Sequence, residues 1–129
     1  MKEISCGTII INNNKILLIK SNRNEYGFPK GHVENNELYK ETALRETKEE
    51  TNLDVEIING YCYKISYKSY GNDKDVYYYL AYPLSYDIKR QVSEVSDIIW
   101  VDKNDVINYL KFDNLKDMYK KALIDINNL

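Results

Sequence analysis

The chain has 129 residues, a length that suits one compact domain with one hydrophobic core. Its composition is 43% hydrophobic and 29% charged, which is typical of a globular protein and excludes a disordered one. The formal net charge of −2 disfavours binding to duplex nucleic acid, because proteins that grip a phosphate backbone are basic. We therefore expect no DNA partner, whereas a small anionic ligand held through a metal ion is compatible with this charge.

The cysteines and the apolar segments indicate the cellular compartment in which we expect the protein. Cys6 and Cys62 form no Cys-x-x-Cys pair, and we expect both to be small buried residues in strands. The N-terminus has no apolar run of signal-peptide length, and no stretch approaches the roughly 20 apolar residues of a membrane span. The sequence thus predicts a cytoplasmic protein without a membrane partner, and we expect a monomer.

Strands and helices are predicted to alternate along the chain. Runs of apolar and β-branched residues bounded by Asn, Gly and Pro indicate strands, and runs of helix formers without Gly or Pro indicate helices. The predicted strands are 5–11, 15–20, 53–67, 76–82 and 97–101; the predicted helices are 38–51, 104–110 and 114–126; and 21–31 and 85–96 are predicted as loops, the second with a short helix as the alternative. This order predicts an α/β fold over residues 1–129, with a mixed β-sheet sandwiched between α-helices.

Three glutamates share one face of the helix predicted at 38–51. Glu46, Glu49 and Glu50 stand at positions i, i+3 and i+4, within roughly 100° of the helix circumference. They repel one another, and the macrodipole disfavours negative charge near the helix C-terminus. A hard divalent cation reverses this repulsion, and oxygen ligands indicate Mg²⁺, with Mn²⁺ as the alternative ion. On spacing alone, a solvated acidic helix face is the competing interpretation.

The segment GHVENNELYKETALRETKEETNL, residues 31–53, places these glutamates in a longer pattern. It contains Gly31, five residues, Glu37, seven residues, and then Arg45 followed directly by Glu46, with a Glu-Glu pair two residues later. Six such identities in register arise by chance at on the order of one in ten million starting positions in a sequence. On these residues the chain resembles the Nudix hydrolases, and the resemblance implies one Nudix domain over residues 1–129.

Three positions depart from the usual Nudix motif. Thr47 stands where an aliphatic residue is usual, and we expect its methyl group to pack. Asn36 and Asn52 replace glycines, and we expect both to adopt the left-handed conformation, which Asn tolerates next best after Gly. None of these changes removes a carboxylate, so the expected chemistry is unaffected.

The resemblance implies roles for the motif residues. In Nudix enzymes the first and last glutamates of this run ligate metal ions, which here implies Glu46 and Glu50, with Glu49 as a further ligand or proton acceptor. The arginine and the earlier glutamate form a supporting ion pair, here Arg45 with Glu37. Helix spacing alone also allows Arg45 to pair with Glu41.

Two further positions are implied by the same resemblance. The carbonyl group that precedes the motif glycine often adds a metal ligand, which here is that of Lys30. Family members often place another glutamate on a loop outside the motif, and Glu94 is the candidate, with an exposed loop acid as the competing interpretation. A bound metal would lower the pKa of a water molecule, and a carboxylate would remove its proton.

The segment YGFPKGHVE, residues 26–34, resembles the corresponding loop of asymmetrical diadenosine tetraphosphate hydrolases, which carry Trp where this chain has Tyr26. That resemblance implies hydrolysis of diadenosine tetraphosphate, or a related dinucleoside polyphosphate, to AMP and ATP. It also implies that Tyr67 and Phe112 stack on an adenine. The side chains implied to contact phosphates are Lys30, His32 and Tyr78. For each aromatic residue, ordinary packing is the competing interpretation, because the chain has 13 tyrosines.

Two other functions are compatible with the sequence. The first is hydrolysis of the 5′ pyrophosphate of RNA, since that Nudix branch has a similar loop and helix. The aromatic pair and the acidic net charge favour a dinucleotide instead. The second is a non-catalytic Nudix domain that senses a nucleotide, which the full set of motif carboxylates disfavours.

Overall fold

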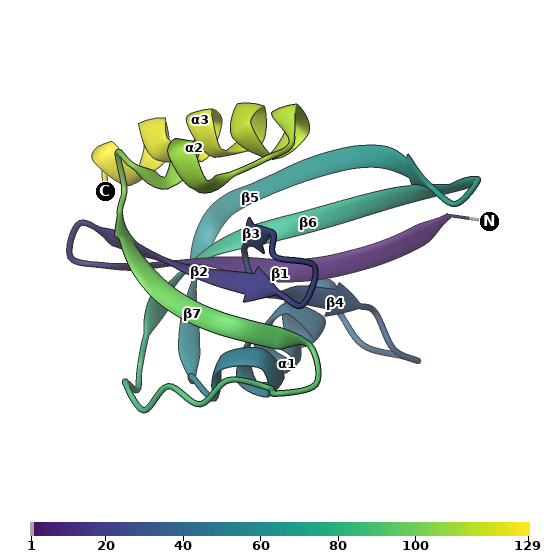
Figure 1. Cartoon of the computed structure of the whole chain (residues 1–129), viewed down its shortest axis with the longest axis horizontal. Coiled ribbons are helices and arrows are strands. Elements are labelled where there is room, and N and C mark those ends of the chain that lie inside the picture. Colours follow the sequence, from purple (N-terminus) through teal and green to yellow (C-terminus); the bar gives the residue numbers. More distant parts are fainter. Residues whose placement is uncertain (1) are drawn as a thin grey trace.

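A computed structural model describes residues 2–129 and shows a β-sheet with helices on both faces (Figure 1). The strands are β1 (Glu3–Asn12), β2 (Lys15–Ser21), β3 (Tyr26–Gly27), β4 (Lys30–His32), β5 (Val55–Ser69), β6 (Asn72–Pro83) and β7 (Val95–Asp102), and the helices are α1 (Tyr39–Thr51), α2 (Val106–Tyr109) and α3 (Asp113–Asn127). Helix α1 covers one face, and α2 and α3 cover the other. The predicted mixed sheet between helices is therefore confirmed.

The sheet is built around β1 and β6. Its order is β3-β2-β1-β6-β5, with β4 paired to β1 and β7 paired to β2. Strands β1 and β6 are parallel, whereas every other pair is antiparallel. Strand β5 continues through Asn59 and Gly60, and its register against β6 shifts between Ile57 and Cys62. The segment predicted as a loop at 21–31 contains the short strand β3 and the start of β4, because both pair with longer strands.

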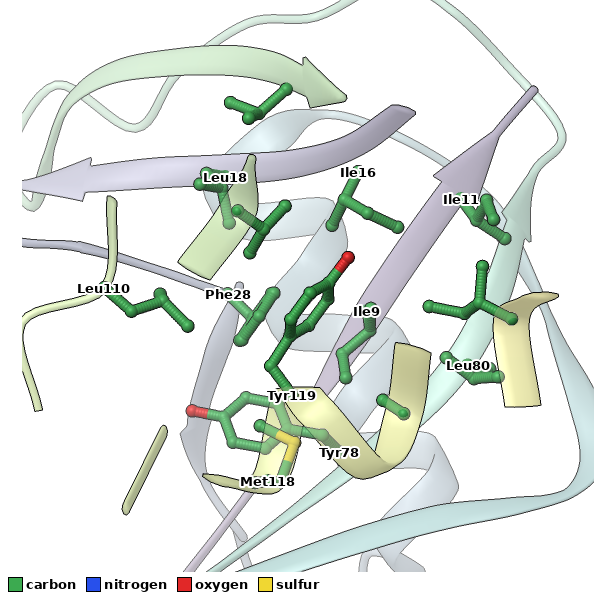
Figure 2. Packing of buried hydrophobic residues seen from close by; sticks show 14 of the residues in the cluster. Ile9, Ile11, Ile16, Leu18, Phe28, Tyr78, Leu80, Leu110, Met118 and Tyr119 are labelled. Carbon is green, nitrogen blue, oxygen red and sulfur yellow. The ribbon is translucent and has the colours of Figure 1, made fainter. Parts of the chain in front are cut away.

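Two hydrophobic clusters lie on opposite faces of the sheet. Successive residues of a strand point to opposite faces, so Ile9 joins the cluster beside α3 whereas Ile10 joins the cluster on the α1 side. In the larger cluster the Phe28 ring lies edge-on to Tyr78, with centroids 5.5 Å apart, and parallel to Tyr119, with centroids 6.0 Å apart (Figure 2). Burial on both faces fixes the register of β1, since a shift by one residue would exchange the two sets.

Some predictions for single residues are confirmed and one is wrong. Asn36 and Asn52 both have positive φ, 64° and 67°, which confirms the left-handed conformation predicted for them. Cys6 is buried, but the prediction for Cys62 is wrong: it is exposed because side chains alternate between the two faces of β5, and Cys62 lies on the exposed face with Lys64 and Ser66. Within residues 2–129, no helix is long and apolar enough to cross a membrane.

Thr47 is buried against the sheet through a paired hydroxyl group. Its Oγ1 donates to the carbonyl of Ala43 at 2.7 Å and lies 2.6 Å from Oγ1 of Thr8 on β1. Because the Thr47 hydroxyl proton is used within the helix, the Thr8 hydroxyl donates to Thr47. The polar residue at an aliphatic position of the motif is thus satisfied by a second threonine from the facing strand.

We expect Thr47→Val to lower the free energy of unfolding by about 1–3 kcal/mol, because the Thr8 hydroxyl would be left buried without a partner. The double variant Thr8→Val/Thr47→Val should recover most of this loss, since both polar groups are then removed. Urea unfolding of the wild type, both single variants and the double variant measures the coupling. A double variant that is no more stable than Thr47→Val would contradict the pairing.

Candidate functional site

Two glycines bring strand β4 and helix α1 close to strand β1. A Cβ atom at Gly7 would overlap the carbonyl of Pro29 and the side chain of Lys30, and a Cβ atom at Gly31 would fall on the carboxylate of Glu46. Strands β1 and β4 pair Gly7 with Lys30, and Thr8 N–H donates to the Pro29 carbonyl at 3.1 Å. The absence of side chains at these two positions therefore lets the α1 carboxylates rest on the β4 backbone.

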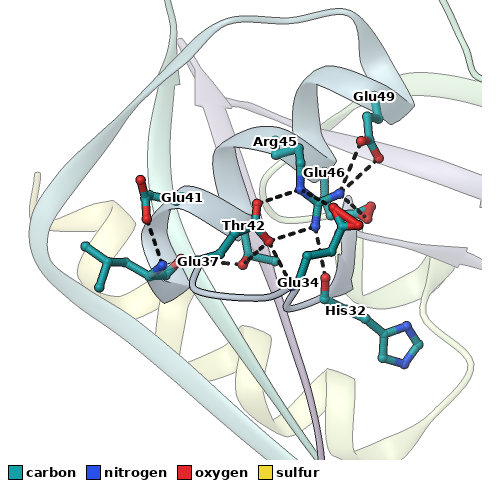
Figure 3. A network of polar contacts seen from close by, with 9 residues as sticks. His32, Glu34, Glu37, Glu41, Thr42, Arg45, Glu46 and Glu49 are labelled. Atoms are coloured by element: carbon teal, nitrogen blue, oxygen red, sulfur yellow. Dashed lines mark hydrogen bonds and ion pairs between the residues drawn. The ribbon is translucent and has the colours of Figure 1, made fainter.

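The Arg45 guanidinium connects the carboxylates along α1 (Figure 3). Its Nε and Nη2 donate to both oxygens of Glu37 at 2.7 and 3.0 Å, which is the predicted ion pair. Its Nη1 donates to Glu46 at 3.2 Å and to both oxygens of Glu49 at 3.1 and 3.2 Å. The alternative partner Glu41 instead accepts from the main-chain N–H of Leu38 at the start of the helix.

Glu37 and Glu46, at the two ends of this network, have pKa values shifted in opposite directions. The Arg45 guanidinium lowers the pKa of Glu37 to about 2, with further hydrogen bonds from Glu34 N–H and the Thr42 hydroxyl, so Glu37 is ionised. Its carboxylate partners in turn raise the pKa of Arg45. Burial raises the pKa of Glu46, and the neighbouring Glu49 raises it further. Glu37 thus anchors Arg45, whereas Glu46 is short of compensating positive charge.

Glu50 is the most buried carboxylate of the site. It is 4% exposed, and within residues 2–129 its Oε2 has no hydrogen-bond partner. Burial raises its pKa to about 8, with the Glu46 charge as the next cause, while the ammonium group and main-chain amide of Lys30 partly oppose the shift. A buried carboxylate without enough donors is unfavourable unless a cation satisfies it, so Glu50 and Glu46 fit a bound metal ion.

Lys30 lies beside these carboxylates. The pKa of Lys30 is lowered by its burial and then by the charge of Lys74, and Glu50, Glu46 and Glu94 oppose that shift. Lys74, whose charge acts on Lys30, was not predicted from the sequence. Parallel pairing of β1 with β6 sets it opposite Glu3, a non-local contact for which the sequence carries no local signal. The Lys30 ammonium group provides positive charge that suits phosphate groups.

The loop at residues 84–94 is tied to the C-terminal end of α1. Gln91 N–H donates to the Glu50 carbonyl at 3.3 Å, and Lys89 N–H donates to the Thr51 carbonyl at 3.0 Å. Glu94 follows on this loop; its side chain is exposed, and its charge contributes to the raised pKa values of both Glu46 and Glu50. The structure therefore brings Glu94 to the carboxylate cluster although it lies far away in sequence.

The acidic residues do not yet form a complete set of metal ligands. Among residues 2–129, no three His, Cys, Asp or Glu side chains converge as a metal site. The Arg45 Nη1 group holds both oxygens of Glu49 and one of Glu46. Glu46 and Glu50 fit a cation as placed, whereas Glu49 would have to leave Arg45 to join them.

His32 and Tyr78 are the other residues predicted to contact phosphates. The His32 side chain is 64% exposed and its ring points away from the carboxylates; its main-chain carbonyl, which accepts from Arg45 Nη2 at 3.0 Å, is the part that meets the site (Figure 3). Tyr78 is 1% exposed and packs edge-on to Phe28 in the core. The Glu50 charge contributes to the raised pKa of the Tyr78 hydroxyl, so the contact between Tyr78 and a phosphate stays a prediction.

Tyr67 and Phe112 lie on the two elements that border a groove of about 430 Å³. The groove runs between β5 and α3 and is lined by Tyr63, Ile65 and Ser66 on one side and by polar residues of α3, among them Asn114 and Asp117, on the other. Tyr67 is half-buried against the larger core cluster, and Phe112 is exposed at the start of α3. Neither ring lines the groove, but Tyr67 follows its β5 residues and Phe112 precedes its α3 residues along the chain.

Comparisons with known proteins agree with this fold. A model of the NUDIX domain matches residues 1–122. Asymmetrical bis(5′-nucleosyl)-tetraphosphatase of Sus scrofa is 35% identical over 92 residues, which cover 68% of this chain and 63% of the relative. The chain therefore spans less than two thirds of that relative's length.

Solved structures show the same architecture. A Caenorhabditis elegans Ap4A hydrolase in a binary complex superposes with a TM-score of 0.89 at 23% identity, over 98% of this chain and 99% of the other. A NUDIX hydrolase from Nitrosomonas europaea superposes with a TM-score of 0.81 at 26% identity, over 98% and 72%. Nudix hydrolases generally use divalent metal ions. Because the family model covers nearly the whole chain and the motif residues gather around one guanidinium, this chain belongs to the Nudix family, and it is related to the Ap4A hydrolases.

Proposed function

We propose that this protein is an Mg²⁺-dependent hydrolase of diadenosine tetraphosphate or a related dinucleoside polyphosphate, which it cleaves to AMP and ATP. The observation that carries the proposal is the buried Glu50 carboxylate, which lies beside Glu46 and Lys30 and whose Oε2 has no hydrogen-bond partner within residues 2–129. That combination offers oxygen ligands to a hard cation and positive charge to phosphates. The relationship to asymmetrical bis(5′-nucleosyl)-tetraphosphatases supports the choice of substrate.

The residues have distinct tasks in this proposal. Glu46 and Glu50 would hold the ion, with Glu49 joining them, and the carbonyl of Lys30 is a further ligand. A bound Mg²⁺ would supply charge neutralisation of the phosphate oxygens and a water molecule of lowered pKa. Lys30 binds and orients the polyphosphate, while Glu37 keeps Arg45 in place behind the ligands.

The chemical step is attack of water on phosphorus, with Glu94 as the proposed base. The water oxygen forms a bond to one phosphorus of the bridge, and the water proton passes to the Glu94 carboxylate. The bond between that phosphorus and the bridging oxygen breaks, and the departing phosphate takes the electron pair. Glu94 belongs to the loop at residues 84–94, which is hydrogen-bonded to the end of α1. The Glu94 side chain is exposed, so its carboxylate is accessible to a water molecule.

Adenine recognition is proposed for Tyr67 and Phe112. Each is close in sequence to residues that line the β5–α3 groove, and a flat base could stack on an aromatic face there. Stacking on both rings would distinguish a nucleoside polyphosphate from inorganic polyphosphate.

A substrate panel tests the proposed function directly. We expect diadenosine tetraphosphate to yield AMP and ATP with Mg²⁺, and no turnover when EDTA removes the metal. Products should be identified by ion-exchange chromatography, with 5′-triphosphorylated RNA in parallel. Release of pyrophosphate from RNA together with an intact dinucleotide would assign the RNA-end activity instead. Binding without turnover of either substrate would indicate a nucleotide sensor.

We expect Glu50→Gln to abolish most of the hydrolysis and to stabilise the metal-free protein at pH 9. Burial raises the pKa of Glu50 to about 8, so metal-free stability falls as pH rises from the unfolded value of 4.5 through this pKa. Glutamine keeps the size but removes the buried charge. Thermal unfolding in EDTA at pH 5 and pH 9 checks the stability, with Glu56→Gln on the exposed face of β5 as the control. Near-native turnover of Glu50→Gln at saturating Mg²⁺ would exclude the assigned role.

We expect Tyr67→Ala to raise the KM for diadenosine tetraphosphate and to leave kcat nearly unchanged. Losing one stacked base costs about 1–3 kcal/mol of binding free energy. Tyr67→Phe should be mild, because the face of the ring makes the contact. Tyr67 also packs against the core, so thermal stability is measured for both variants. Lower stability with an unchanged KM would show that Tyr67 is a packing residue only.

A further inference from the structure

Every N–H group of the Arg45 guanidinium has a partner, and the partners fall into two halves. Nε and Nη2 hold Glu37 and the His32 carbonyl, at 2.7 to 3.0 Å. Nη1 holds Glu46 and Glu49, at 3.1 to 3.2 Å. The first half anchors the side chain to residues outside the proposed metal site. The second half occupies carboxylates within it.

Metal binding and Arg45 therefore compete for the same oxygens. Nη1 bonds both oxygens of Glu49, so this carboxylate cannot turn to an ion and keep its present contact. Glu49 is 44% exposed, which leaves it room to move. When Glu46 and Glu49 coordinate a metal ion, the Nη1 half of the guanidinium loses both carboxylate partners. It then also lies beside a new positive charge.

Glu34 is the carboxylate placed to receive that half. Its Oε1 lies 3.2 Å from Arg45 Nε as an ion pair, while the Nε hydrogen bond goes to Glu37. The Glu34 side chain is 65% exposed, and Arg45 is its one cationic partner within residues 2–129. It lies in the loop between β4 and α1, and its own main-chain N–H is fixed by Glu37. Its backbone is thus held, and its exposed carboxylate now rests at Nε, from which it would have to move to reach Nη1.

We propose that Arg45 exchanges carboxylates when a divalent metal ion binds, and that Glu34 is the positioning residue that takes over the released half of the guanidinium. The inference rests on the metal-dependent function proposed above. With Glu34 present, Nη1 gives up Glu46 and Glu49 without losing all negative charge. In a protein without the Glu34 carboxylate, the metal ion has to take Glu46 and Glu49 away from Nη1, and Nη1 is then left with no carboxylate partner.

Titration calorimetry with Mn²⁺ alone, without nucleotide, tests the exchange in a four-variant cycle. The proteins are the wild type, Glu34→Gln, Arg45→Gln and the double variant. We expect Glu34→Gln to weaken Mn²⁺ binding about three- to fivefold in the wild-type background, as befits an exposed charge contact. In the Arg45→Gln background the same change should alter the affinity less than about twofold, because no guanidinium is left to hold.

The other outcomes overturn the proposal. An equal loss in both backgrounds means that Glu34 acts on the ion itself, as a ligand or through its charge, and no loss in the wild-type background means that it has no part in binding. Thermal unfolding verifies that each variant folds, and Arg45→Lys replaces Arg45→Gln as the background if the latter does not. Glu56→Gln is the matched control for removing one exposed acid. A wild type that binds no Mn²⁺ would overturn the metal-dependent function as well, whereas wild-type binding without a Glu34 effect overturns the exchange alone.

Discussion

The site depends on one cation that holds like charges together. Glu34, Glu37, Glu46 and Glu49 all lie within ion-pair distance of the Arg45 guanidinium, which cannot neutralise four carboxylates. Repulsion among them would otherwise destabilise the end of α1, where the helix dipole is also unfavourable. The metal-free protein therefore keeps a deficit of positive charge at its centre. Such a deficit of positive charge fits a divalent cation.

The deficit matters because the backbone gives the carboxylates no room to separate. Glycine at positions 7 and 31 lets β4 lie against β1 and lets Glu46 lie against β4. The loop at residues 84–94 closes the far side by bonding to the last carbonyls of α1, which keeps Glu50 out of water. Close approach produces burial, and burial raises the pKa of Glu50 and Glu46. The chemistry of the site is thus a consequence of how tightly three backbone segments meet.

Departures from the family motif show which of its features are physical requirements. A left-handed residue is needed after α1, and Asn52 supplies it with φ of 67° where glycine is usual. A buried side chain is needed at position 47, and threonine is accepted there because Thr8 on β1 pairs with its hydroxyl. What the fold requires at these positions is a backbone conformation and a satisfied interior. The identity of the residue is secondary to both.

The sequence by itself determined the elements whose cause is local. The glutamate spacing, the left-handed asparagines, the Arg45–Glu37 pair and the alternation of strands and helices all follow from residues near one another in the chain or from a contiguous motif. Only the tertiary structure decided which side chains face the site. The parallel β1–β6 pairing sets Lys74 opposite Glu3, the Tyr78 ring packs in the core, and the His32 ring turns outward. Burial and non-local pairing belong to the packed sheet, so a motif that lists residues in order does not contain them.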